Sequence, residues 1–229
     1  FYDDQISHAS GTKQFWDASY NYLYQMEKIF AEPFDNSLRS LSDKFWASWE
    51  ELGAFPADFA HREVVTERAQ GLVTRIKDIY DKLTQLRSRA NQEVIADVSR
   101  INSIGSSIRE LNEQILKLQA LGDHPNDLMD RRDKLVEELS GMVNIQVGRG
   151  DQDELFVFIG EQALVQGKVH RKLKATADPL NDGMARVTWE HSDKDLVLGS
   201  GKLLGTLDMR DKAITERLDQ VDLFAVNLS

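Results

Sequence analysis

The stretch that decides the fold runs from Phe59 to Leu121, FAHREVVTERAQGLVTRIKDIYDKLTQLRSRANQEVIADVSRINSIGSSIRELNEQILKLQAL, and contains no proline. Its apolar residues recur at steps of three and four, which is the seam of a coiled coil. The seam positions are Val65, Ala69, Leu72, Ile76, Ile79, Leu83, Leu86 and Ala90, then, after a slip of one residue, Val94, Val98, Ile101, Ile104, Ile108, Leu111, Ile115 and Leu118. At 1.5 Å per residue the helix would extend for roughly 90 Å, which is far longer than one globular core requires.

Two shorter amphipathic helices are predicted before the long one. Apolar residues recur at helical spacing over residues 5–30 and again over Ser37–Leu52. The stretch Glu32–Asn36 contains a proline and breaks the first helix, and Gly53–Pro56 ends the second.

A change of period follows the long helix. Gly122–Pro125 makes a tight reversal, after which Asn126 or Asp127 is expected to cap a helix that stops at Gly141. The apolar period then changes from that of a helix to that of a strand, with glycines between short apolar runs, one of them Val169–Leu173. Helical spacing returns in the last segment, from Lys202 to Leu228.

These patterns predict a mainly α fold with a small β insert, in which an elongated long-helix or coiled-coil bundle carries a small antiparallel β domain. The expected domains are the first part of the helical bundle over residues 1–143, the β insert over residues 144–199, and a returning helix over residues 200–229 that completes the bundle.

Composition excludes several classes of function. The 229 residues include 38 acidic and 28 basic side chains, for a net charge of −10, whereas nucleic-acid binding favours the opposite balance. The absence of cysteine excludes disulfides, thiolate nucleophiles and thiolate metal sites. The chain contains no apolar run long enough to span a membrane and opens on Phe1 rather than Met, so we expect a trimmed fragment.

Each pattern that could support chemistry has a simpler structural explanation. Gly199-Ser200-Gly201-Lys202 lacks the Ser or Thr that follows the lysine of a phosphate-binding loop, so a flexible joint between sheet and helix is favoured. The five histidines show no pair at helical ligand spacing, and no Gly-x-Ser-x-Gly elbow occurs. We therefore predict no catalytic residue, no cofactor and no metal.

A row of carboxylates could either bind a metal ion or form ion pairs. Asp127, Asp130, Asp133 and Glu137 share one helical face. Calcium and magnesium usually take oxygens that converge from a loop, whereas Asp127 with Arg131, and Asp130 with Lys134, have the spacing of helical ion pairs. An ion-pair face is the favoured interpretation.

The tryptophans Trp16, Trp46 and Trp49 allow two interpretations. They could form an aromatic recognition surface, because tryptophan is enriched at interfaces. Their helical spacing with neighbouring apolar residues favours burial in the core. Trp189, at the end of a predicted strand, is ambiguous.

Five segments resemble the flagellar hook-associated protein 1 family, in the right order and over nearly the whole chain. One of them, Pro56–Ala69, resembles the start of the family's long helix. Ile29–Leu38 resembles the family's Asn-Glu-Pro-x-Asp-x-x-Leu loop, although Ala31 stands where the family usually has Asn. Phe45–Leu52 resembles its aromatic helix, Asn126–Leu135 its Asn-Asp-Leu-Leu-Asp-Gln-Arg-Asp segment, and Gly201–Asp211 the start of its returning helix. The residues that carry these motifs, with roles expected to be structural, are Glu32, Pro33, Asp35, Phe45, Trp49, Asn126, Asp127, Asp130, Arg132, Asp133, Asp208 and Arg210.

The resemblance implies a structural, secreted subunit of the bacterial flagellum at the junction between hook and filament, needed for filament assembly. It implies export by the flagellar type III apparatus without a cleaved signal. The implied partners are copies of itself in a ring, the hook protein, the second hook-associated junction protein, and a cytoplasmic export chaperone that binds a C-terminal segment. The sequence is expected to be a central fragment without the family's terminal axial-core segments, which would include that C-terminal segment.

Three other classes stay open at this point. A flagellin-like filament or junction subunit would share the coiled-coil pattern, but the Asn126–Leu135 segment argues against it. A coiled-coil adaptor of a cytosolic complex would form a closed two-stranded seam. An enzyme with a helical body would need a polar constellation in a pocket, which the sequence does not offer.

Overall fold

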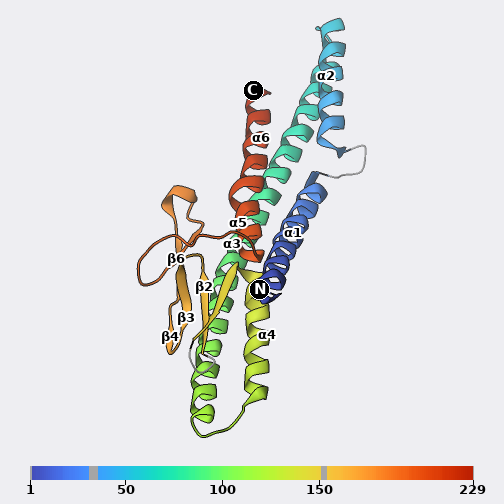
Figure 1. Cartoon of the computed structure of the whole chain (residues 1–229). Helices are drawn as coiled ribbons and strands as arrows, with labels where there is room; N and C mark the ends of the chain where they lie inside the picture. Colours follow the sequence, from blue (N-terminus) through green and yellow to red (C-terminus); the bar gives the residue numbers. More distant parts are fainter. Residues whose placement is uncertain (1, 31–35, 151–153, 229) are drawn as a thin grey trace. The chain divides into compact units, whose positions relative to one another are not determined.

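The computed structural model describes residues 2–30, 36–150 and 154–228, with the side chains of the first helix described from Ala9 onward. The helices are α1 (Tyr2–Phe30), α2 (Leu38–Ala54), α3 (Phe59–Gln119), α4 (Asn126–Met142), α5 (Lys202–Asp208) and α6 (Ile214–Asn227) (Figure 1). The strands are β1 (Ile145–Arg149), β2 (Leu155–Ile159), β3 (Gln162–Gln166), β4 (Val169–His170), β5 (Leu173–Ala177) and β6 (Ala185–Trp189). The predicted fold class, mainly helical with a long helix and a small antiparallel sheet region, is confirmed.

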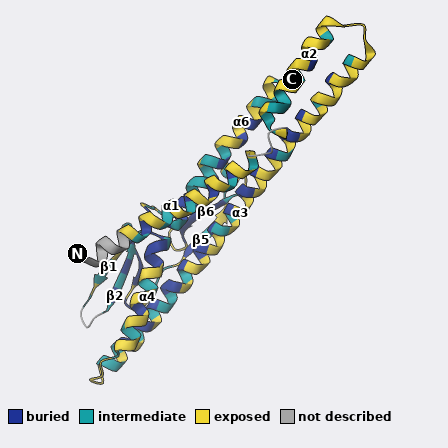
Figure 2. Cartoon of the chain, turned by 90° about the vertical axis from the view of Figure 1, so that its right-hand side faces the viewer, coloured by how far each residue is buried: buried dark blue, intermediate teal, exposed yellow. Residues whose placement is uncertain are grey.

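The long-helix prediction is accurate at the level of single residues. Every predicted seam position of α3 from Leu72 to Ile115 is buried, as is Val65, while Ala69 and Leu118 are half-buried. Burial follows this seam because apolar surface removed from water contributes about 25 cal/mol per Å². Figure 2 shows the buried residues recurring along α3 between exposed ones.

The chain divides into two compact units: unit 1 is Phe1–Tyr20 with Arg89–Asp211, and unit 2 is Asn21–Ser88 with Lys212–Ser229. The three-part domain division predicted from sequence stays a prediction.

Unit 1 has one apolar core shared by helices and strands. β1, β2, β3 and β4 form an antiparallel sheet in that order, and β5 pairs with β6 in a second sheet. Along β2 the burial alternates, because successive side chains point to opposite faces. The inward residues pack with the second half of α3, with α4 and with α5, and the largest of them is the fully buried Trp189.

Unit 2 is helical. The α3 seam from Val65 to Leu86 is buried there, as are Tyr22 and Met26 of α1 and Ile214, Leu218 and Val221 of α6. Arg75, itself buried, donates from Nη2 to the Ile29 carbonyl at 2.9 Å, which ties α3 to the last turn of α1. The hydroxyl of Ser37 accepts from the Ser40 N–H and caps α2 at the residue where the sequence predicts the helix to begin.

Four local predictions are wrong. α4 is preceded by Pro125 at the N-cap, without a side-chain cap, rather than by Asn126 or Asp127. It also continues past Gly141, which is buried against the Gln14 side chain, and ends at Met142. The predicted strand Val169–Leu173 is divided between β4 and β5, and the returning helix contains a π turn over Met209–Ala213.

A fifth error concerns the glycine-containing segment before α5, which is tightly packed instead of a flexible joint. Gly201 has a φ of 102° and donates to the Gly11 carbonyl at 3.1 Å. A Cβ at Gly201 would lie 2.5 Å from the Met142 carbonyl oxygen, so only glycine fits.

Candidate functional site: asparagines and buried arginines on the long helix

Three asparagines of α3 hold the first residues of three strands. The Asn112 amide bonds both backbone groups of Leu155, donating to the carbonyl at 2.8 Å and accepting from the N–H at 3.3 Å. Asn102 does the same for Leu173, at 2.8 and 2.9 Å. Asn91 accepts from the Ala185 N–H at 2.7 Å. Since Leu155, Leu173 and Ala185 begin β2, β5 and β6, the helix supplies the hydrogen bonds that another strand would supply.

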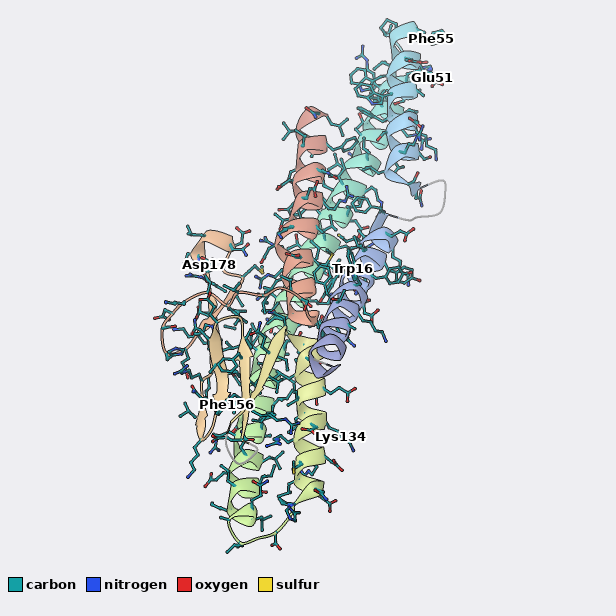
Figure 3. The ribbon with its side chains drawn as sticks, in the orientation of Figure 1. Trp16, Glu51, Phe55, Lys134, Phe156 and Asp178 are labelled. Atoms are coloured by element: carbon teal, nitrogen blue, oxygen red, sulfur yellow. The ribbon has the colours of Figure 1, made fainter. Side chains whose placement is uncertain are left out.

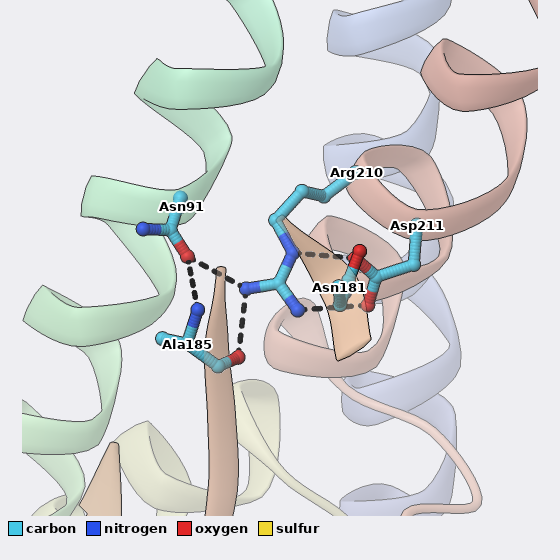
Figure 4. Close-up of polar contacts among 5 residues, drawn as sticks. All are labelled: Asn91, Asn181, Ala185, Arg210 and Asp211. Carbon is cyan, nitrogen blue, oxygen red and sulfur yellow. Dashed lines mark hydrogen bonds and ion pairs between the residues drawn. The ribbon is translucent and has the colours of Figure 1, made fainter. Parts of the chain in front are cut away.

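Arg210 supplies the hydrogen bond to the Ala185 carbonyl that Asn91 does not make (Figure 4). Its Nη1 donates to the Asn91 side-chain oxygen at 2.8 Å and to the Ala185 carbonyl at 2.9 Å. Its Nε and Nη2 donate to the two carboxylate oxygens of Asp211, at 2.7 and 2.8 Å, and Asn181 donates to the same carboxylate at 2.9 Å. Arg210 is only 2% exposed, so this set of partners offsets the cost of removing a guanidinium from water.

Arg132 bonds Asn112 in the way that Arg210 bonds Asn91. Its side chain is fully buried, and Nη1 donates to the Asn112 oxygen at 3.0 Å. That oxygen also accepts from Leu155, so the arginine on α4 fixes the amide orientation that β2 requires. The two arginines of the family-like motifs thus perform the same task at two points of α3.

A third cross-link joins α5 to α3. Lys202 contacts Glu93 at 2.6 Å and Asp97 at 3.0 Å. Burial raises the pKa of Asp97, and the nearby Lys202 ammonium opposes that rise. Burial lowers the pKa of Lys202, but its bonds to Glu93 and Asp97 outweigh this and leave that pKa raised. The ammonium is therefore occupied by the carboxylates of Glu93 and Asp97.

The remaining predicted site residues lie in varied surroundings. Asn126, Asp127, Asp130 and Asp133 are exposed on α4, Asp208 is half-buried on α5, and Phe45 is half-buried on α2. Glu32, Pro33 and Asp35 lie outside the described residues. The structure therefore brings Arg132 and Arg210 into packed clusters with α3 and leaves the acidic row of α4 at the surface.

The predicted ion-pair face of α4 is not formed by the expected pairs. Within the described ranges, no ion pair joins Asp127 to Arg131 or Asp130 to Lys134, and Figure 3 shows Lys134 projecting outward. Arg132 Nε approaches Asp133 at 4.0 Å, and Glu138 receives a bidentate contact from Arg100 of α3 at 2.7 and 2.8 Å. Glu138 therefore joins α4 to α3, whereas Asp127, Asp130 and Asp133 stay at the surface.

The interpretation of Trp16, Trp46 and Trp49 as core residues is wrong for all three, whereas Trp189, which the sequence left ambiguous, is buried. Trp16 is 63% exposed, Trp46 54% and Trp49 47%, and Trp16 projects from α1 in Figure 3. Near the turn between α2 and α3, Phe55 and Phe59 are 60% and 70% exposed. Large exposed aromatic residues of this kind are typical of surfaces that other chains cover.

The described residues hold no group of three His, Asp or Glu side chains placed to bind a metal. Among the same residues, no helix combines the length and apolar character needed to cross a membrane. His61 pairs with Asp58 at 2.9 Å, and His191 packs edge-on against Trp189.

Sequence reasoning missed Asn91, Asn102, Asn112, and the pairing of Lys202 with Asp97. A signal existed for the asparagines. Each directly follows a seam residue of α3, and their separations of eleven and ten residues are close to three helical turns. Polar residues beside the seam at such a period indicate a second element along the helix.

The fold and these clusters define a class of long-helix protein whose polar core residues fix a small β region against the helix. The family model described as the flagellar hook-associated protein FlgK helical domain matches residues 23–229. The chain belongs to this family.

Relatives agree with that assignment. The chain is 33% identical over 147 residues to flagellar hook-associated protein 1 of Bacillus subtilis, covering 64% of this chain and 29% of the relative. It is 27% identical over 225 residues to the Salmonella typhimurium protein of that name, covering 94% and 40%, and equally identical to that of Escherichia coli, covering 94% and 41%. The chain thus spans about two fifths of these enterobacterial relatives.

A solved structure shares the fold. The flagellar hook junction protein FlgK from Burkholderia pseudomallei matches with a TM-score of 0.81 and 24% identity, over 90% of this chain and 39% of that one.

Proposed function

We propose that this chain is the helical part of a structural, non-enzymatic subunit that joins hook to filament in the bacterial flagellum, and that the full-length protein is needed for filament assembly. Family membership and the names of the relatives, flagellar hook-associated protein 1 and flagellar hook junction protein, support the proposal. The family-motif residues have structural roles in it, including Glu32, Pro33 and Asp35. The division into residues 1–143, 144–199 and 200–229 is part of the same proposal.

The observation that carries the proposal is that the buried motif arginines stabilise the fold, whereas the tryptophans of α2 are exposed. Arg132 and Arg210 are inside, where Arg132 bonds Asn112 of α3, and Arg210 bonds Asn91 of α3 and the backbone of Ala185 in β6. Trp46 and Trp49 are exposed on α2. In the isolated chain their apolar surface faces water, which is unfavourable in free energy. A subunit that buries this apolar surface against its neighbours is stabilised by the burial when it assembles.

The partners proposed are further copies in a ring, the hook protein and the second hook-associated junction protein. A cytoplasmic export chaperone would bind a C-terminal segment of the full-length protein. The location proposed is the extracellular flagellum, reached through the flagellar type III apparatus without a cleaved signal.

The test is deletion of the full-length gene in its own bacterium, followed by electron microscopy of the cells and immunoblotting of the medium. We expect hooks without filaments and filament subunits lost into the medium, both reversed when the intact gene is returned on a plasmid. Normal filaments on the deletion strain would contradict the proposal and favour a cytosolic adaptor.

A further inference from the structure

His170 lies in an unusual position at the edge of the four-stranded sheet. β4 contains only Val169 and His170, paired with Gln166 and Val165 of β3, and it covers the outer edge of β3. One further bond, from the Arg171 N–H to the Leu164 carbonyl at 2.8 Å, continues the ladder. Such a short ladder contributes little by itself, so what holds β4 in place is the packing of its side chains.

The imidazole ring lies directly on α3. A Cβ built at Gly105 would approach His170 Nε2 at 2.6 Å and Cδ2 at 2.9 Å, so the ring occupies space that only glycine leaves open. Nε2 is buried and has no hydrogen-bond partner among the described residues. The contact therefore suits a neutral imidazole, whose unprotonated nitrogen can be buried at much lower cost than an unpaired cation.

The charges around the ring also disfavour a proton. Burial lowers the pKa of His170, and the cationic side chains of Lys172 and Arg109 lower it further. Arg109, on α3, is itself shared with Glu110 and Glu113, at 3.2 and 3.8 Å, and neither carboxylate bonds to the imidazole. A proton on His170 would add a third positive charge, and among the described residues no acceptor bonds the buried Nε2.

We propose that His170 is an acid-sensitive latch, which holds β4 on α3 when neutral and releases it when protonated. The linkage follows from the direction of the pKa shift. A released histidine binds a proton near its ordinary pKa of about 6.5, whereas the latched one resists protonation until lower pH. The latched form is therefore fully favoured above the ordinary value and loses its advantage as the pH falls below it.

Release would uncover the outer edge of β3. That strand contains the buried residues Ala163, Leu164 and Val165, and an uncovered edge presents unpaired N–H and C=O groups that another strand can bind. The latch thus makes the β3–β4 edge of the sheet sensitive to pH. The proposed junction function gives this edge no role, and the latch does not depend on that function.

The test is amide hydrogen exchange of the purified chain at about pH 7.5 and about pH 5.5, with rates corrected for the intrinsic effect of pH. In the wild type we expect protection of the Arg171 N–H, which bonds the Leu164 carbonyl across the β3–β4 pair, to fall several-fold at the lower pH, while β1 and β2 keep their protection. His170→Gln, which cannot gain a proton, should show no such fall. His124→Gln, which removes an exposed histidine from the turn between α3 and α4, should behave as the wild type.

Two results would overturn the latch: equal acid sensitivity in His170→Gln and wild type, or no loss of protection in the wild type. A second measurement needs no variant. Titration of the His170 ring signals by NMR should place the pKa of His170 below the ordinary value of about 6.5, and a pKa that is not lowered would reject the proposal even if His170→Gln does not hold β4 at either pH.

Discussion

At the scale of single residues, Arg210 shows how one buried side chain can join three segments distant in sequence. It bonds Asn91 on α3, the backbone of Ala185 in β6, and Asp211 beside it. Arg210→Met keeps most of the apolar stem but leaves the Ala185 carbonyl without this donor. We expect the free energy of unfolding, measured by urea denaturation, to fall by about 3 kcal/mol.

The matched control for that change is Arg217→Met. Arg217 is exposed on α6 and donates a hydrogen bond to Gln220 in the next turn. We expect its loss to change stability by less than about 0.5 kcal/mol. Equal effects of the two substitutions would mean that the cluster around Arg210 contributes nothing beyond an ordinary surface contact.

Asn102 permits a substitution that is nearly unchanged in shape. In Asn102→Asp an ionised carboxylate still accepts from the Leu173 N–H but cannot donate to the Leu173 carbonyl, so we expect a loss of about 1–3 kcal/mol. A protonated carboxyl regains one donor. The difference in stability between variant and wild type should therefore shrink as the pH falls toward the carboxyl range, and a difference independent of pH would contradict the assigned bonds.

The hydrogen-bond partners of Arg210 and Asn102 are the part of the site that the sequence could not predict. Arg132 and Arg210 stand out through their motifs, but Arg210 meets Asn91 and Ala185 only after the chain has folded back on itself. No local pattern specifies which backbone carbonyl a buried arginine will bind. The asparagines were detectable only as polar residues that follow seam positions, which is a weaker signal than the seam itself.

At the scale of elements, the α3 seam was predictable because sixteen apolar positions follow one another along the helix at steps of three and four. The π turn at Met209–Ala213 was not, because a single widened turn leaves the helical spacing of its neighbours almost unchanged. The connection before α5 was also misjudged, since glycines permit both a flexible joint and a close backbone approach.

Gly201 decides between those two interpretations. In Gly201→Ala the new Cβ would meet the Met142 carbonyl at 2.5 Å and Val143 Cα at 2.7 Å, in a backbone conformation with a φ of 102°. We expect a loss of at least about 2 kcal/mol, measured as unfolding free energy.

Gly71→Ala is the comparison for that result. Gly71 is an exposed residue within α3, and nothing lies within 4 Å of a Cβ placed there. Replacing glycine by alanine in a helix interior should therefore stabilise the chain by up to about 1 kcal/mol. If both alanines stabilised, the close packing of Gly201 against the end of α4 would be excluded.

At the scale of the whole molecule, the errors about tryptophan carry information. Hydrophobic spacing predicts that a side chain will be buried, but it does not say whether its own chain or a neighbouring one will bury it. Trp189 is buried within the chain, whereas Trp46 and Trp49 are about half exposed. Under the proposed function, we expect Trp46 and Trp49 to be buried only in the assembled state.

The double variant Trp46→Ala with Trp49→Ala separates stability from assembly. Because both side chains are exposed, we expect the melting temperature of the purified chain to change by only a few degrees. Introduced into the full-length gene, the same variant should reduce the number of filaments per cell, because aromatic side chains dominate the energy of many interfaces. Exported protein measured in the medium controls for a failure of secretion.

A matched variant at another exposed site shows whether the effect belongs to α2. Leu180 is 97% exposed at the β5–β6 turn, and Leu180→Ala removes apolar surface far from α2 in sequence. We expect filaments to form normally with Leu180→Ala and poorly with the tryptophan variant. Normal filaments in both strains would show that the α2 tryptophans remain exposed in the flagellum and that the contacts of the junction lie elsewhere. Loss of filaments together with a large fall in melting temperature would instead place the tryptophans among the residues that stabilise unit 2.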